Sequence, residues 1–96
     1  MNLYKVSQDI VGGYDTYSDM VVCAESEDDA ITIHPSKYVT HLKNGVWYGT
    51  YTKFGEYETG LDEWCESKKE NFVVEFLGIA NENIKRGVIV SSFHAG

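Results

Sequence analysis

Residues 12–36, GGYDTYSDMVVCAESEDDAITIHPS, contain every kind of element that a small α+β domain needs. Two successive glycines allow positive φ angles without Cβ strain, so the chain can reverse there. The apolar run at 20–24 is typical of a strand that is buried on both faces. Ser26 is placed to cap a short helix, with Asp29 at the capping-box position, and Pro35 forbids its continuation. We therefore predict a turn, a strand, a helix and a stop.

A strand is predicted before this stretch and a hairpin after it. Residues 2–8 alternate apolar and polar side chains, as a half-buried strand does. Asn44 and Gly45 separate two β-rich runs, 38–43 and 46–52, and Asn-Gly is the preferred pair for a two-residue hairpin turn. That turn makes Leu42 the partner of Trp47 and Tyr38 the partner of Tyr51. The predicted core face of the hairpin carries these four side chains: Tyr38, Leu42, Trp47 and Tyr51.

The last part of the chain predicts two more strands. Residues 53–71 are polar, and we expect them to form a mobile insertion. Strand character returns at 72–79 and at 87–93, and two strands adjacent in sequence are expected to pair antiparallel. The prediction is one α+β domain over residues 1–96, in the order ββα-hairpin-ββ. It has a single, mainly antiparallel sheet of five or six strands and one principal helix.

Composition excludes several classes of protein. Hydrophobic residues make up 43% of the 96 residues and aromatic residues 14%, which argues against disorder. The formal charge of −7 repels duplex DNA and anionic membranes, but suits docking on a basic protein surface. No apolar run approaches the length of a membrane span, and the N-terminal residues lack the apolar core of a signal peptide. We expect a cytoplasmic protein.

No catalytic or metal-binding signature is present. The three histidines, His34, His41 and His94, stand in separate elements without the spacing of converging zinc ligands. Cys23 and Cys65 fit no ligand motif and are expected to be free thiols. No strand-turn-helix elbow frames a serine, and no glycine-rich phosphate loop occurs. We expect no metal, no cofactor and no enzymatic activity.

The clearest candidate binding residues follow the two glycines. Tyr14 and Tyr17 offer aromatic faces for stacking, and Asp15 and Thr16 offer polar groups for a ribose hydroxyl. Packing at the sheet edge is the alternative for both tyrosines. Arg86, the one arginine of the chain, suits a bidentate contact to a phosphate. An exposed salt bridge to a nearby glutamate is its alternative.

Three further polar residues complete the candidate ligand site. His34 and Ser36 lie on either side of the proline that ends the helix. Ser92 lies near the end of the last strand, where it shares a face with His94 and follows an apolar strip. Such an end of a strand suits a polar ligand or a contact between subunits, and simple fraying is the alternative.

Several of these motifs resemble a family of small phage and prophage proteins. The resemblance rests on the first strand, on GYDTY at 13–17, on the alanine-acidic stretch 24–30, on IHPS at 33–36, and on the closing GVIV and SF-AG residues. It covers about half of the chain, and residues 38–71 match nothing in that family. His94 stands where the family is expected to have asparagine.

This resemblance implies a role in counter-defence and leaves two hypotheses open. One is an oligomeric sponge, which binds a host immune nucleotide such as a cyclic dinucleotide or a cyclic ADP-ribose derivative and withholds it from its effector. Such a sponge would act in the cytoplasm of the host cell. The other is an acidic inhibitor, similar to anti-CRISPR proteins, that occupies the basic nucleic-acid groove of a host defence protein. The net charge favours the second hypothesis, whereas the GYDTY and HPS residues favour the first.

Overall fold

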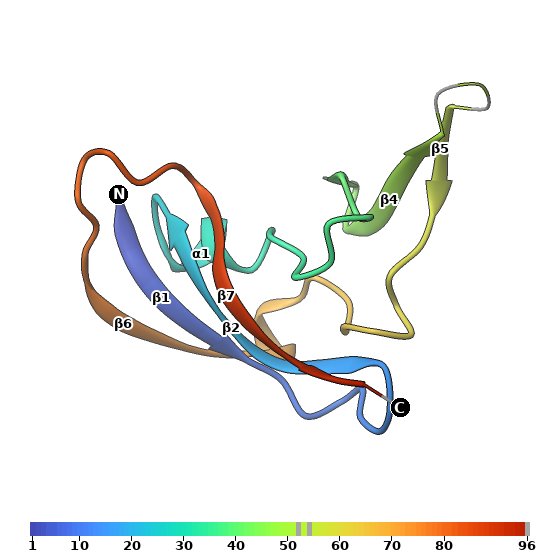
Figure 1. Cartoon of the computed structure of the whole chain (residues 1–96), viewed down its shortest axis with the longest axis horizontal. Coiled ribbons are helices and arrows are strands. Elements are labelled where there is room, and N and C mark those ends of the chain that lie inside the picture. Colours follow the sequence, from blue (N-terminus) through green and yellow to red (C-terminus); the bar gives the residue numbers. More distant parts are fainter. Residues whose placement is uncertain (52, 54, 96) are drawn as a thin grey trace.

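Seven strands in two sheets, with one short helix, make up the described part of the computed structural model (Figure 1). The structure describes residues 1–51, 53 and 55–95. The elements are β1 (Asn2–Ser7), β2 (Thr16–Ala24), α1 (Glu27–Ala30), β3 (His41–Lys43), β4 (Val46–Tyr51), β5 (Gly55–Glu58), the 3-10 turn η1 (Lys69–Asn71), β6 (Val73–Ile79) and β7 (Gly87–His94). The α+β class and the antiparallel pairing are as predicted, but the single sheet is wrong.

The larger sheet has four antiparallel strands in the order β6-β1-β2-β7. The predicted pairing of the last two strands is therefore wrong, because β6 and β7 form opposite edges. The apolar β1–β2 hairpin occupies the centre, where β1 pairs with β6 and β2 pairs with β7. Figure 1 shows the connection after β6 crossing the end of the sheet, past the N-terminus, to reach β7.

The smaller sheet, β3-β4-β5, has the predicted hairpin register. Leu42 pairs with Trp47, and Asn44 and Gly45 both have positive φ angles, as the turn requires. The first strand begins only at His41, since the backbone N–H of Tyr38 donates to Ser36 Oγ in the preceding turn. Tyr38 is consequently 68% exposed, and its predicted place on the core face is wrong. The side chain of Tyr51 lies outside the described residues.

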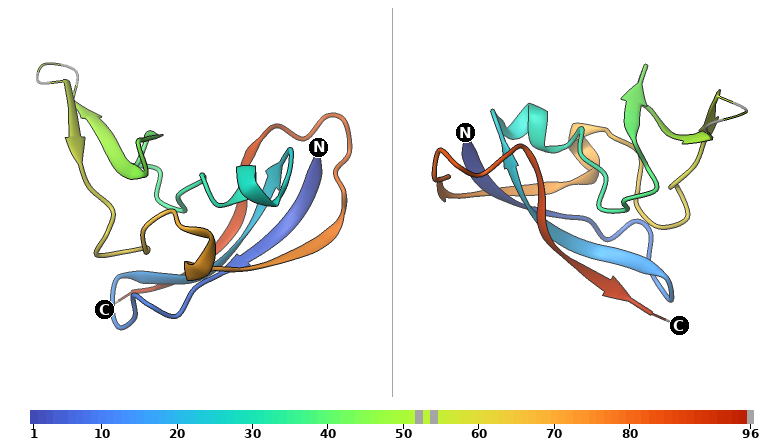
Figure 2. Two further views of the ribbon diagram at one scale, coloured as in Figure 1. Left: turned by 180° about the vertical axis from the view of Figure 1, so that it is seen from behind. Right: turned by 45° about the horizontal axis from the view of Figure 1, so that its top comes forward.

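The short helix has the predicted cap. Ser26 Oγ accepts the backbone N–H of Asp29, and the Asp29 carboxylate accepts the N–H of Glu25. Helix α1 spans only four residues and is held against β1, β2 and β6. Two further views show it lying on one face of the four-stranded sheet, the face toward β4 and β5 (Figure 2).

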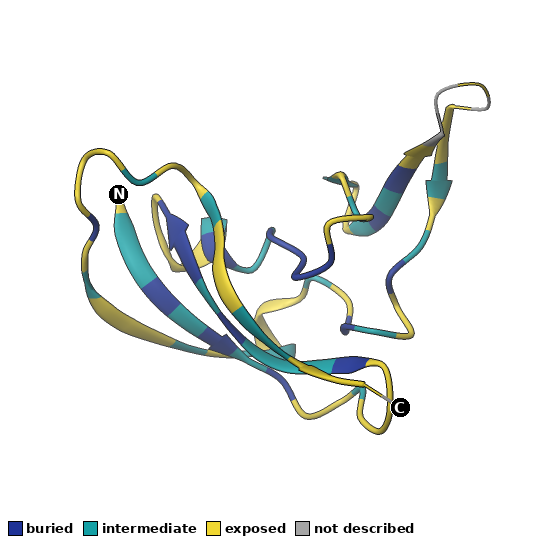
Figure 3. Cartoon of the chain, in the orientation of Figure 1, coloured by how far each residue is buried: buried dark blue, intermediate teal, exposed yellow. Residues whose placement is uncertain are grey.

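The core lies between this face of the larger sheet and the segments that lead to and from the smaller one. The buried side chains of this face include Val6, Met20 and Val22, and Trp47 and Trp64 belong to the same core cluster. In Figure 3 the buried residues run along β1 and β2 and continue into the loops beyond α1. Trp64, which is fully buried, comes from the polar segment 53–71, for which no core residue was predicted. That segment also contains β5 and η1.

Candidate functional site

The loop between β1 and β2 is built around the side chain of Gln8. Its Oε1 accepts the backbone N–H groups of Ile10 and Val11, at 2.9 and 2.8 Å. Its Nε2 donates to the carbonyls of Val11 and Tyr17, at 2.8 and 2.7 Å. Gln8 is buried, and these four hydrogen bonds use both ends of its amide. The loop is therefore held in one shape by the protein itself.

The tip of this loop presents Tyr14 to solvent. Gly13 has φ = 95° and Asp15 has φ = 60°, so the chain turns back through two left-handed residues. Buried Thr16 donates from its hydroxyl to the Gly13 carbonyl at 2.8 Å, and the backbone N–H of Asp15 donates to the carbonyl of His94. The turn is closed below the tyrosine, whose side chain remains 81% exposed.

A surface cavity of about 510 Å³ lies beside this turn. Ser18 and His94 form one part of its wall and share a hydrogen bond of 3.1 Å between Oγ and Nε2. Cavities that hold small ligands have volumes of roughly 300–1,000 Å³. The lining residues that bear on recognition are Asp9, Gly13, Tyr14, Thr16, Ser18 and His94. Three of the predicted residues, Tyr14, Asp15 and Thr16, thus lie at or beside one cavity.

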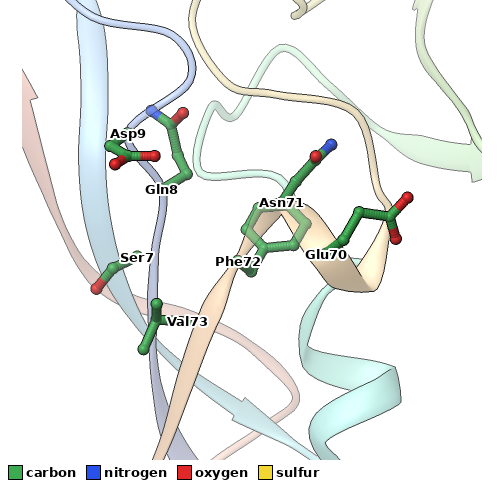
Figure 4. Close-up of a pocket in the computed structure, with 7 residues that line it drawn as sticks. All are labelled: Ser7, Gln8, Asp9, Glu70, Asn71, Phe72 and Val73. Atoms are coloured by element: carbon green, nitrogen blue, oxygen red, sulfur yellow. The ribbon is translucent and has the colours of Figure 1, made fainter.

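A smaller depression of about 270 Å³ lies on the other side of Gln8 and Asp9 (Figure 4). Its far wall is formed by Glu70 and Asn71, with the ring of Phe72 between the two sides. Its ionised lining groups are carboxylates. It has two carboxylates, Asp9 and Glu70, whereas the cavity beside Tyr14 has only Asp9 among its described lining residues, so an anionic ligand meets less repulsion beside Tyr14.

Carboxylates also gather behind the turn. Burial, and then the neighbouring Asp62 and Asp15, raise the pKa of Glu63 above that of an ordinary glutamate. Burial and the charge of Glu63 raise the pKa of Tyr17, which a hydrogen bond with Ser36 partly offsets. Asp62 and Asp15 therefore lie close to the Glu63 carboxylate. This end of the molecule is strongly acidic.

Two of the predicted ligand residues, His34 and Ser36, point into the interior. The backbone N–H of Ser36 donates to His34 Nδ1 at 3.0 Å, so the proton is on Nε2, which donates to the Gly60 carbonyl at 3.0 Å. The ring packs edge-on against Trp47 at 5.0 Å, and burial lowers its pKa. Both ring nitrogens form hydrogen bonds within the chain, and His34 thereby links the two segments that flank the smaller sheet.

Ser36 and Tyr17 form a second, interior group. Ser36 is buried, and its Oγ also accepts the N–H of Tyr38 at 3.2 Å. Tyr17 packs against Phe93 of β7 with ring centroids 4.7 Å apart. The alternative of packing at the sheet edge therefore describes Tyr17 better than it describes Tyr14.

Arg86 lies at the other end of the sheet, beside α1. Its Nε and Nη2 bind the Asp29 carboxylate at 2.9–3.1 Å, and Nη2 also donates to Thr32 Oγ1 at 2.9 Å. The hydrogen bond from Arg86 lowers the pKa of Asp29. Arg86 immediately precedes β7, whereas Tyr14 lies beside the last residue of that strand. Within one chain, the structure does not bring these two predicted site residues together. Ser92, half-buried on β7, pairs with Asp19 of β2.

Neither cysteine belongs to a reactive site. Cys23 and Cys65 are buried free thiols, and burial raises the pKa of Cys65 to about 11. A thiol with so high a pKa is a poor nucleophile at neutral pH. Across residues 1–51, 53 and 55–95, no group of three or more histidine, cysteine, aspartate or glutamate side chains is arranged to hold a metal ion.

Comparisons of the chain with protein families, with curated proteins and with solved structures gave no match. No helix among the described residues is long and apolar enough to cross a membrane.

Proposed function

We propose that the protein binds and sequesters a nucleotide without chemically changing it, as a phage-type counter-defence protein would. The ligand class is a cyclic dinucleotide or a cyclic ADP-ribose derivative. The observation that supports this most is the highly exposed Tyr14 ring at the rim of a cavity of about 510 Å³. A tyrosine left so exposed on a tightly closed turn is available to stack on a base.

The remaining lining groups suit the polar parts of a nucleotide. The hydrogen-bonded Ser18 and His94 side chains lie within reach of a ribose or phosphate in the cavity. Gly12 and Gly13 bring the backbone close to the cavity without side chains in the way. Because Gln8 fixes the loop before any ligand arrives, binding loses little free energy to ordering.

Stacking on Tyr14 supplies only part of the affinity that a sponge needs. Nanomolar binding corresponds to about 12 kcal/mol, and stacking of one base contributes about 1–3 kcal/mol. The residues that line the cavity include no lysine or arginine. Most of the remaining affinity must come from contacts to the phosphates and sugars.

The test is a thermal-shift screen of the purified protein against cyclic dinucleotides and cyclic ADP-ribose isomers. A ligand present at about 1,000 times its Kd stabilises the folded state by about 4 kcal/mol, equivalent to a rise in Tm of about 16–32 °C for a domain of this size. Nucleotide released by heat denaturation should have its original mass and retention time. An unchanged Tm with every nucleotide of the panel, or release of a cleaved product, would contradict the proposal.

A second candidate function is favoured by the acidic surroundings of the same surface. Ile10 and Leu61 are exposed and line one hollow with Glu66, Lys68 and Glu70, and the carboxylates of Asp9 and Asp62 are their neighbours in sequence. Apolar side chains with an acidic rim complement a basic protein surface that normally holds nucleic acid. On this hypothesis the protein is an inhibitor of a host defence protein.

The double variant Asp62→Asn/Glu63→Gln separates the two candidates. Docking on a basic surface predicts that it weakens co-purification with a nuclease complex and reduces the salt dependence of that binding. Nucleotide binding predicts that it leaves the affinity unchanged or improves it, since negative charge is removed near an anionic ligand.

A further inference from the structure

Strand β7 is an unprotected sheet edge. It runs for eight residues, Gly87–His94, pairs with β2 on one side and has no strand on its other side among the described residues. Its sequence contains no proline, lysine, arginine or carboxylate, the residues that usually guard such an edge. Its exposed apolar side chains are Val88, Ile89, Val90 and Phe93. The edge is suited to pairing with another strand.

The exposed surface of the chain is larger than that of a typical monomer of its mass. The accessible surface is 6175 Å² for 10.8 kDa. Folded monomers of that mass expose about 5,500 Å². The excess of about 600 Å² approaches the roughly 800 Å² that each partner contributes to a stable interface. The apolar edge strands account for much of the large hydrophobic surface that remains exposed.

We propose that a second copy of this chain pairs antiparallel along β7, about a two-fold axis near Val90. The two four-stranded sheets then form one continuous sheet of eight strands. A symmetric antiparallel pairing places each strand against itself, which an uncharged strand allows despite the net charge of −7.

Charges at the two ends of β7 favour this direction of pairing. Lys85 and Arg86 immediately precede the strand. At its other end, Asp19 pairs with Ser92, and the backbone of Asp15 binds that of His94. Arg86 is already paired with Asp29. An antiparallel pair brings Lys85 of each chain next to the acidic end of the other strand, whereas a parallel pair would place like charges together.

The same pairing changes the composition of the candidate site, an extension that rests on the proposed function. Strand β7 bulges at Ile89, because Val88 and Val90 pair with the consecutive residues Val22 and Val21. A two-fold axis through Val90 or Ser91 centres the pairing on the strand. The partner subunit's Arg86 then lies opposite His94, or the partner subunit's Gly87 lies opposite Ala95. In both registers the partner subunit's Lys85 and Arg86 come to the cavity beside Tyr14.

Lys85 is the better of these two cations for a phosphate. Arg86 already binds Asp29 and Thr32, whereas Lys85 is exposed and in no salt bridge of the described residues. The partner thus supplies the positive charge that the cavity lacks in one chain. On this account each dimer holds two equivalent sites, and each site contains residues of both copies.

The mass of the protein in solution tests the interface without any ligand. Sedimentation equilibrium of the wild-type chain should give twice 10.8 kDa. Val90→Glu should give the mass of one chain, because the two introduced carboxylates then lie at the axis or diagonally across it, close together in either register. Val73→Glu is the matched control: Val73 lies on the opposite edge strand, is 63% exposed against 59% for Val90, and should leave the dimer intact. An equimolar mixture of Val90→Glu and Val90→Lys chains should restore the dimer.

A monomeric wild-type chain, or a Val90→Glu chain that remains dimeric, would overturn the interface. For the shared site, Lys85→Ala should remain dimeric and lose at least tenfold in affinity for the nucleotide found in the thermal-shift screen. If Val90→Glu monomers bind that nucleotide as tightly as the wild type, the shared site is wrong although the proposed function stands. If the dimer forms and no nucleotide binds, the interface stands and the proposed function fails.

Discussion

Two neighbouring regions contain predicted ligand residues, and the fold uses them differently. In the junction between the sheets, formed by residues 34–36 and Gly60, the polar atoms of His34 and Ser36 bind other parts of the chain. In the loop tip, residues 13–16, Tyr14 is almost fully exposed. Similar residue types thus stabilise the structure in one region and are available to a ligand in the other. Substitutions in the junction should affect stability, and substitutions at the tip should affect binding.

The largest expected loss of stability is at Gly60. Its φ is +90°, and a Cβ there would lie 2.6 Å from His34 Nε2 and 2.8 Å from Val39 Cγ2. Backbone strain and overpacking together should cost Gly60→Ala about 3 kcal/mol or more in urea unfolding. Gly45→Ala is the control, since φ is also positive there but the space is open; it should lose about 1 kcal/mol. Equal losses of unfolding free energy in the two variants would mean that the junction tolerates an added Cβ as well as an ordinary turn does.

Gln8→Ala tests whether the tip depends on an interior support. It leaves two backbone N–H groups and two carbonyls of the loop without their side-chain partner, and should cost about 2–3 kcal/mol. Gln8→Glu keeps the acceptor but places a buried carboxylate oxygen against the carbonyls of Val11 and Tyr17, and should lose at least as much. Free energies from urea unfolding measure both effects. A cost below about 0.5 kcal/mol for Gln8→Ala would mean that the loop is not fixed by this residue.

The pH dependence of the junction follows from His34. Burial lowers its folded-state pKa below the usual 6.5, so the folded state prefers the neutral ring. The unfolded chain binds the proton more readily, and stability is therefore complete above pH 6.5 and falls as the pH drops below it. Unfolding free energies at pH 7 and pH 5.5 should show this decrease. NMR titration of the His34 ring with a midpoint above 6.5 would contradict the assignment.

The smallest expected effect on stability is at the tip. Tyr14→Ala should change the unfolding free energy by less than about 0.5 kcal/mol, as exposed substitutions usually do. It should nevertheless weaken nucleotide binding about tenfold or more, which calorimetry measures. Tyr38→Ala is the matched control, because Tyr38 is also exposed but lies near the smaller sheet. Loss of binding in both variants, or in neither, would place the ligand elsewhere.

Local signals in the sequence predicted local structure well. Asn44 and Gly45 determine the hairpin register through their own φ angles, and Ser26 caps the helix through a hydrogen bond three residues away. The pairing of β6 with β1 and of β7 with β2 joins segments far apart in the chain, and no turn residue encodes it. The second sheet was missed for a different reason: β5, with the sequence GEYE, lies in a polar segment that shows no strand pattern.

The candidate site was predictable only in part. The two glycines and Tyr14 correctly indicated an exposed turn. The support from Gln8 was missed, because a glutamine at the end of a strand has no sequence pattern that shows what its amide will bind. For Arg86, the alternative of a salt bridge describes its contact in the chain, although the partner is an aspartate, Asp29, in place of a glutamate.

We propose above all that the cavity beside Tyr14 binds a nucleotide. The most direct measurement is the Tm of wild-type protein and of Tyr14→Ala with the same panel of cyclic dinucleotides and cyclic ADP-ribose isomers. We predict a rise of about 16–32 °C for the wild type with at least one member at about 1,000 times its Kd, and a rise about one third smaller for Tyr14→Ala if its affinity falls tenfold. An unchanged Tm for the wild type across the panel, or an equal rise in both proteins, would contradict the claim.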